Sequence, residues 1–190
     1  YEQLRDFRSA AQVYRKALEL QPENSRLKRA LAQALLYSDN VDEALKIYTE
    51  VAAEEPRDVQ AHLRIAEIHR IKRDFVQARA ALEKARQMDG NSLEVRYDEV
   101  NLLDAEGKPE EAIALLKGIL EETAKKDYNL AERSNRAMLL ERLGLLYRSA
   151  GQYPEAVDAF RQIAALDPSN GARAAVHVVG AVGDDDAGAA

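Results

Sequence analysis

A set of residues that recurs every 34 positions is the strongest constraint on how this chain of 190 residues can fold. Two series show the step: the alanines at 10, 44, 78 and 112, and the large side chains Tyr14, Tyr48, Leu82 and Leu116. Self-similarity at such a period is typical of stacked repeats, in which each unit buries its apolar side against its neighbours. The chain is therefore expected to form an array of similar units without a single central core.

Each unit contains two blocks of apolar residues at helical spacing, separated by a short polar break. In the second unit the blocks cover residues 27–35 and 41–51, and the break is Ser38, Asp39 and Asn40. Asn40 with Glu43, and Asp74 with Gln77, have the spacing of a capping box at the start of the second helix. Each unit is therefore predicted to be a helix, a turn and an antiparallel helix.

The fifth unit matches a known repeat pattern most fully. The matching residues are Leu143, Gly144, Tyr147, Gly151, Tyr153, Ala156, Phe160 and Pro168. Together with the other units in register, they make the chain resemble the tetratricopeptide repeat (TPR) over roughly residues 1–170. The resemblance implies an all-α fold, a right-handed α-solenoid of antiparallel helix pairs, which is known as the TPR superhelix.

The register also predicts the boundaries of the units. The chain opens partway through a unit, so we expect a longer parent protein. The predicted segments are a partial TPR at 1–24 (the end of its first helix and its second helix), TPRs at 25–58 and 59–92, a TPR with an extended second helix and an insertion at 93–136, a TPR with an extended first helix at 137–170, a capping helix at 171–182 and a disordered tail at 183–190.

One step of the register is longer than the others. Ala112 and Ala156 are 44 residues apart instead of 34. A longer loop is one explanation, but the flanking stretches remain helix-like, and Asn129 and Glu132 are spaced as a capping box. If the ten residues are shared equally, each helix grows by about 1.4 turns. We therefore expect a long helical hairpin with its tip near residues 126–129.

The fourth unit departs from the pattern in its first helix. Arg96 and Glu99 occupy positions that hold large apolar residues in the other units. The predicted apolar stripe reads Leu93, Tyr97, Val100 and Leu103. The two charged residues are three apart and could pair with each other, or the helix could be rotated. Both interpretations stay open at this point.

Composition argues against several classes of function. The net charge is −6, and no basic stripe of the kind that nucleic-acid binding requires is present. The chain has no cysteine, and no apolar run approaches the roughly 20 residues that span a bilayer. His62 and His69 are about 10 Å apart along one helix, too far to share a metal ion. We therefore predict no enzyme activity, no cofactor, no metal site and no nucleic-acid partner.

The resemblance also implies where a partner would bind. In TPR arrays the first helices line the concave face, and their exposed positions recognise peptides or helices. The corresponding residues here are Arg26, Arg29, Gln33, Tyr37, Arg64, Glu67, Arg70, Glu94, Tyr97, Asp98, Asn101, Glu141, Arg142, Leu145 and Arg148. Residues 89–122 include ten acidic and three basic residues, so a partner with a basic segment is expected. For each single residue, a solvated helix surface without a binding role is the alternative.

Three functions are compatible with such an array. The leading hypothesis is a protein–protein interaction scaffold that binds a peptide or helical segment of a partner in the concave groove. The second is a recruitment or regulatory arm of a larger enzyme, such as a glycosyltransferase, whose catalytic domain lies outside this chain. The third is a self-assembly module that associates through the open ends of the array.

Overall fold

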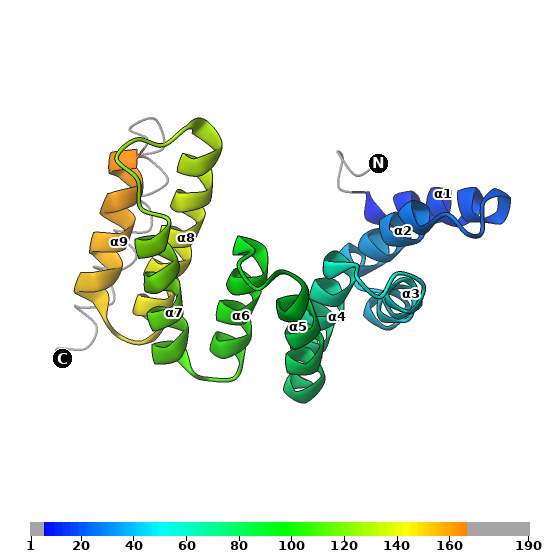
Figure 1. The fold of residues 1–190 in the computed structure, drawn as a ribbon, viewed down its shortest axis with the longest axis horizontal. Helices are drawn as coiled ribbons and strands as arrows, with labels where there is room; N and C mark the ends of the chain where they lie inside the picture. The colour runs from blue at the N-terminus through cyan, green and yellow to red at the C-terminus, as the bar shows by residue number, and fades with distance from the viewer. Residues whose placement is uncertain (1–5, 167–190) are drawn as a thin grey trace. The chain divides into compact units, whose positions relative to one another are not determined.

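The computed structural model describes residues 6–166, and this part of the chain is entirely α-helical (Figure 1). The helices are α1 (Phe7–Leu20), α2 (Ser25–Tyr37), α3 (Val41–Glu54), α4 (Val59–Ile71), α5 (Phe75–Asp89), α6 (Leu93–Ala105), α7 (Pro109–Glu122), α8 (Leu130–Ser149) and α9 (Tyr153–Leu166). The fold is an all-α helical-repeat solenoid, as the sequence predicts. The predicted capping helix at 171–182, the predicted tail at 183–190 and Pro168 lie outside the described residues.

Two compact units make up the chain, and each is described separately below. The N-terminal unit ends at Asp98 and the C-terminal unit begins at Glu99, so the boundary falls within α6. Leu35, Val51 and Ile68 are among the buried residues of the N-terminal unit. Phe160 and Leu116 are buried in the C-terminal unit.

Side-chain caps start several of the helices. Asp74 accepts a hydrogen bond from the backbone N–H of Gln77, and Asp58 caps α4 in the same way. Asn129 and Glu132 form a complete capping box at the start of α8. The capping box predicted at Asn40 is wrong, because the Asn40 side chain makes no cap bond and its amide donates to Ser38 instead.

Small residues set the spacing between packed helices. The register alanines at 44, 78, 112 and 156 are all fully buried. Gly144 on α8 lies against the ring of Phe160 on α9, and a Cβ added at this glycine would come within 2.6 Å of two ring carbons. Since protein interiors are packed as densely as organic crystals, a larger side chain at these positions would force the helices apart.

The turn between the two helices of a unit uses a left-handed residue at equivalent positions. These residues are Asp39 (φ 68°), Arg73 (φ 59°), Gly107 (φ 77°) and Gly151 (φ 73°). Glycine adopts this conformation without steric cost, whereas Asp39 and Arg73 adopt it against their intrinsic preference. The turn geometry is thus retained where the sequence does not supply glycine.

The stripe predicted for α6 is wrong at two of its four positions. Leu93 and Tyr97 are only half-buried, whereas the prediction missed Val95 and Leu102, which are buried. Arg96 and Glu99 lie on the buried side of this helix, four residues before the buried Val100 and Leu103, and both are half-buried. Long charged side chains can cover apolar surface with their methylene groups while their charged ends reach water, so the helix need not rotate to expose them.

The ten additional residues before α9 are not shared between two helices. α7 has 14 residues, as α1 and α3 do, so the expected lengthening of the helix in residues 109–122 is wrong. α8 has 20 residues, whereas α2, α4 and α6 have 13 each. Seven of the ten residues therefore lengthen α8, and three lengthen the turn before it. The local reason is the capping box at Asn129, which starts a new helix well before residue 137, where the register would begin one.

Candidate functional site

The candidate partner-binding residues fall into two sets. Those on α2, α4 and residues 93–98 of α6 belong to the N-terminal unit, and Asn101 and the residues on α8 belong to the C-terminal unit. In the N-terminal unit we use the name first-helix face for the surface formed by Arg26, Arg29, Gln60, Arg64, Glu67, Glu94 and Asp98. Two hydrogen-bonded groups of charged residues occupy it.

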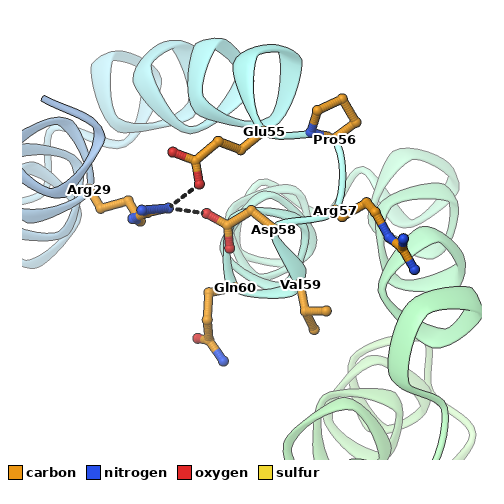
Figure 2. A pocket seen from close by; sticks show the side chains of 7 residues that line it. All are labelled: Arg29, Glu55, Pro56, Arg57, Asp58, Val59 and Gln60. Atoms are coloured by element: carbon orange, nitrogen blue, oxygen red, sulfur yellow. Dashed lines mark hydrogen bonds and ion pairs between the residues drawn. The ribbon is translucent and has the colours of Figure 1, made fainter. Parts of the chain in front are cut away.

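The first group joins α2 to the start of α4 (Figure 2). Nη1 of Arg29 donates to Glu55 Oε2 at 3.1 Å and to Asp58 Oδ2 at 2.5 Å. The Asp58 side chain is only 10% exposed, and its other oxygen accepts the backbone N–H of Ala61. A hollow of about 450 Å³ lies beside this group, lined in part by Gln60. Arg29 is thus held by two carboxylates that follow α3.

The second group joins α4 to the first turn of α6. Arg64 donates to Glu67 at 2.6 Å and approaches Glu94 at 3.4 Å, and Gln60 donates to the other oxygen of Glu94 at 2.5 Å. Gln60 and Glu94 are 34 residues apart, so they occupy the same position in consecutive units. A contact between equivalent positions is what a stacked array predicts for neighbouring first helices.

Arg64 is the electrostatic centre of this second group. Burial by itself lowers the pKa of Arg64, but the hydrogen bond to Glu67 and the negative charge of Glu67 and Asp98 outweigh it, so the pKa lies above its usual value. One guanidinium therefore faces the three carboxylates of Glu67, Glu94 and Asp98. Among these four side chains, the carboxylates outnumber the guanidinium.

The other candidate partner-binding residues of the N-terminal unit make fewer polar contacts. Arg26, Gln33 and Tyr37 are exposed, and Arg70 is half-buried. Within residues 6–166, the guanidinium groups of Arg26 and Arg70 make no ion pair. The Tyr37 ring packs against the ring of Phe7, with their centroids 4.9 Å apart.

The candidates of the C-terminal unit lie mostly on α8. Arg142 donates to Asp104 of α6 at 2.7 Å, so this residue ties two first helices together. Its Nε is buried without a hydrogen-bond partner. Glu141, Leu145, Arg148 and Asn101 are partly exposed.

Sequence reasoning missed the partners of the predicted residues. Glu55, Asp58, Gln60 and Asp104 hold Arg29, Glu94 and Arg142 in place, yet none was a candidate. Gln60 lies four residues before Arg64 and therefore on the same helix face, and this spacing could have indicated it. The Arg142 contact spans 38 residues, and no local pattern indicates such a pair.

The histidines and the remaining ligand-type residues do not assemble a metal centre in the described part of the chain. Within residues 6–166, no three His, Cys, Asp or Glu side chains are grouped so that they could hold a metal ion. His62 is buried, with Nε2 at 3.2 Å from the carbonyl oxygen of Pro56, and His69 Nδ1 is 3.7 Å from Asp74. Among these same residues, no helix has the length and apolar character needed to cross a membrane.

Family models for the tetratricopeptide repeat match residues 3–68, 71–133 and 137–170, and so cover most of the chain. The chain belongs to the tetratricopeptide repeat family. No curated protein matches the sequence of this TPR protein.

Solved structures of similar fold are also TPR proteins. TTC0263 of Thermus thermophilus, a thermophilic TPR protein, is 20% identical, with a TM-score of 0.75 over 95% of this chain and 93% of its own. YrrB, described as a TPR protein with an unusual peptide-binding site, is 19% identical, with a TM-score of 0.58 over 93% of this chain and 86% of its own. At these identities the likeness shows the fold alone. TPR proteins are in general non-catalytic scaffolds for protein partners, and this chain has their fold.

Proposed function

We propose that this TPR protein is an interaction scaffold whose first-helix face binds a peptide or helical segment that carries basic side chains. The observation that carries the proposal is the surplus of carboxylates around Arg64 on the outward side of α4 and α6. Side chains that face outward on the first helices are available to a partner, whereas those on the opposite side hold the repeats together.

The chemistry of the face favours a cation. Because the three carboxylates of Glu67, Glu94 and Asp98 lie around the single guanidinium of Arg64, this surface would attract a lysine or arginine of a partner. Glu94 is nearly half-exposed, so a partner can reach it without unfolding the unit. The same charges would accelerate encounter with a basic segment at low ionic strength.

The face also favours an extended, polar contact over a deep pocket. The hollow beside Arg29 is open, and it is lined by charged and polar residues together with Pro56 and Val59. Binding energy would thus come from several charged contacts spread along two or three first helices. Such contacts fix register and orientation, and their strength falls as salt increases.

A phage-displayed library of random 15-residue peptides tests the proposal. The wild-type protein should enrich sequences rich in lysine and arginine, and the double variant Glu94→Lys with Asp98→Lys should lose this enrichment. Glu83→Lys is the matched control, because Glu83 is an acidic residue on α5, outside the first-helix face, and pairs with Arg86. Circular dichroism would show that all three proteins remain helical.

Three outcomes of the peptide-library experiment would contradict the proposal or its control. Equal enrichment of basic peptides by the wild type and by the double variant would show that the first-helix face is not part of the binding site. Enrichment of acidic or apolar peptides by the wild type would overturn the predicted chemistry of the partner. Loss of enrichment in Glu83→Lys as well would show that the effect is nonspecific charge reversal.

A further inference from the structure

The side chain of Tyr48 on α3 is buried in the core that α3 shares with α2 and α4. Only 3% of the residue is exposed, and its core cluster also contains Leu35 of α2 and Ile68 of α4. The polar and charged groups that act on its hydroxyl all belong to α2 or to α4 with its N-cap, and they are Tyr37, Asp58, Arg64 and Glu67. The hydroxyl end of Tyr48 therefore points away from α3, towards the two first helices that carry the first-helix face.

Packing of the repeat does not require this hydroxyl. The equivalent positions of the other units hold Tyr14, Leu82, Leu116 and Phe160. Leu82, Leu116 and Phe160 are buried at this position without a hydroxyl. An apolar side chain of similar size thus fills the same space, and the oxygen of Tyr48 is open to another role.

The Tyr48 hydroxyl also has unused hydrogen-bonding capacity. Within residues 6–166 it makes no hydrogen bond. In the same part of the chain, the side-chain atoms that are sealed from solvent without a partner are His69 Nδ1 and Arg142 Nε, so the Tyr48 oxygen keeps some contact with solvent. A molecule that covers the first-helix face would remove this contact. It must then supply a hydrogen-bond partner, because a buried hydroxyl without one is costly.

The electrostatic surroundings select the kind of atom that can serve the hydroxyl. Burial raises the pKa of Tyr48 to about 12, so the group keeps its proton at neutral pH and can donate. Among the neighbouring charges, Arg64 acts on this pKa most strongly and opposes the effect of burial. The guanidinium disfavours a partner's cation at this point, and Glu67 and Asp58 disfavour a carboxylate. A neutral carbonyl oxygen meets both conditions.

We propose that the Tyr48 hydroxyl donates a hydrogen bond to a backbone carbonyl of the segment bound on the first-helix face, an inference that rests on the function proposed above. The bound segment is extended at this point, because the interior carbonyls of an α-helix already accept bonds within the helix. Its basic side chains reach Glu94 and Asp98. Tyr48 thus selects the conformation of the partner, whereas the carboxylates select its charge.

Fluorescence anisotropy with a synthetic peptide tests the role of the hydroxyl. The probe is the basic 15-residue peptide that the wild type enriches most from the library. Tyr48→Phe should raise its dissociation constant by about 3- to 10-fold, and urea unfolding should show that the variant is folded, because Phe160 fills the equivalent position. Tyr153→Phe is the matched control, since Tyr153 is a half-buried tyrosine of α9 outside the first-helix face. Equal affinity of wild type and Tyr48→Phe overturns the proposal.

Ester substitution in the peptide tests the acceptor itself. An ester carbonyl is a weaker hydrogen-bond acceptor than an amide carbonyl, so a series of peptides with one ester each probes every backbone position. At one position the ester should weaken binding to the wild type several-fold more than binding to Tyr48→Phe. A purely structural effect of Tyr48→Phe would weaken all peptides by one factor. The absence of any coupled position overturns the proposal, as do helical carbon chemical shifts of the bound peptide at that position.

These experiments distinguish this inference from the function on which it rests. If the variant Glu94→Lys with Asp98→Lys loses binding but Tyr48→Phe keeps full affinity, the basic-partner function stands and the role of Tyr48 is wrong. If the wild type enriches no basic peptide, the proposed function is wrong, and the hydrogen bond to a bound segment is wrong with it. Coupling at a single ester position, with loss of binding in both variants, supports both.

Discussion

The first helices α4, in the N-terminal unit, and α8, in the C-terminal unit, carry the same kinds of residues on their buried sides and different residues on their outward sides. Both bury apolar residues and a small residue, Ala66 or Gly144, at the equivalent position. Outward, α4 presents a charged group centred on Arg64, whereas α8 presents Leu130 and Met138. The repeat therefore restricts only one side of each first helix and leaves the other side free to acquire a function.

The largest expected effect concerns the core of the C-terminal unit. Phe160→Ala removes a fully buried ring that packs on Gly144, and it should lower the free energy of unfolding by about 3–5 kcal/mol. Hydrogen exchange should show the loss in α8 and α9, because repeats transmit stability mainly to their neighbours. Equal loss of protection in α1 and α2 would instead indicate one cooperative unit.

A second prediction concerns the N-terminal unit and high pH. Burial raises the pKa of Tyr48 to about 12 from its ordinary value of 10.0. The folded pKa is the higher one, so this contribution to stability is complete below pH 10 and is lost as the pH rises towards 12, by roughly 2–3 kcal/mol. Tyr48→Phe should be less sensitive to alkali in urea titrations at pH 9 and 11.5. An unchanged pH dependence would contradict the prediction.

Two glycines of the C-terminal unit give opposite predictions. Gly144→Ala forces a methyl group against the Phe160 ring and should destabilise the protein by about 1–3 kcal/mol. Gly118→Ala on α7 meets no heavy atom within 4 Å, so it should stabilise by up to about 1 kcal/mol through helix propensity. Thermal unfolding of the two variants measures the difference. The same sign for both would show that packing at Gly144 is looser than the structure indicates.

The ion pairs of the first-helix face should contribute less than the core. A double-mutant cycle of Arg29→Gln and Asp58→Asn should give a coupling of about 0.5–1 kcal/mol, reduced in 1 M NaCl. Asparagine retains the cap of α4, so the cycle isolates the ion pair. Arg161 and Asp158, a well-exposed pair on α9, should show no measurable coupling. A salt-independent coupling at Arg29 would exclude an electrostatic origin.

The smallest effect concerns the start of α8. The hydrogen bond from Lys125, and then the backbone N–H of Asn129, lower the pKa of Glu132 below its usual value of 4.5. Because the folded pKa is the lower one, the stabilisation is present above pH 4.5 and is lost as the pH falls through the folded pKa. The NMR signal of the Asn129 amide should shift below pH 4.5 in wild type but not in Glu132→Gln. A shift that persists in Glu132→Gln would assign the titration to another group.

The sequence predicted the repeat well because helix periodicity and the 34-residue step are local, redundant signals. The prediction from sequence was wrong where a side chain can adopt either of two local arrangements. On α6 the register placed Arg96 and Glu99 at positions that are apolar in the other units and left open whether they pair or the helix rotates. Their long stems allow both to lie on the buried side of the helix. At Asn40 the amide bonds to Ser38 instead of capping its helix, a competition between local hydrogen bonds that spacing cannot resolve.

The candidate site was predictable only in part. The first-helix positions follow from the register, but the contacts of Arg29, Arg64 and Arg142 join residues that are 26 to 38 positions apart. Such contacts depend on how closely successive first helices approach, which no local spacing specifies. The role of these residues in binding stays a prediction.

The length of the extension of α8 has a geometric consequence. Seven residues turn an α-helix through about 700°, only about 20° short of two full revolutions. The added turns are therefore in phase with the rest of α8, so Gly144 and the buried leucines keep their orientation towards α9 while the outward side is prolonged in line. An insertion of five residues would have displaced the face of the new segment by about 140°. A gene that gains codons for two whole turns can thus acquire a new contact surface without repacking the repeat on either side.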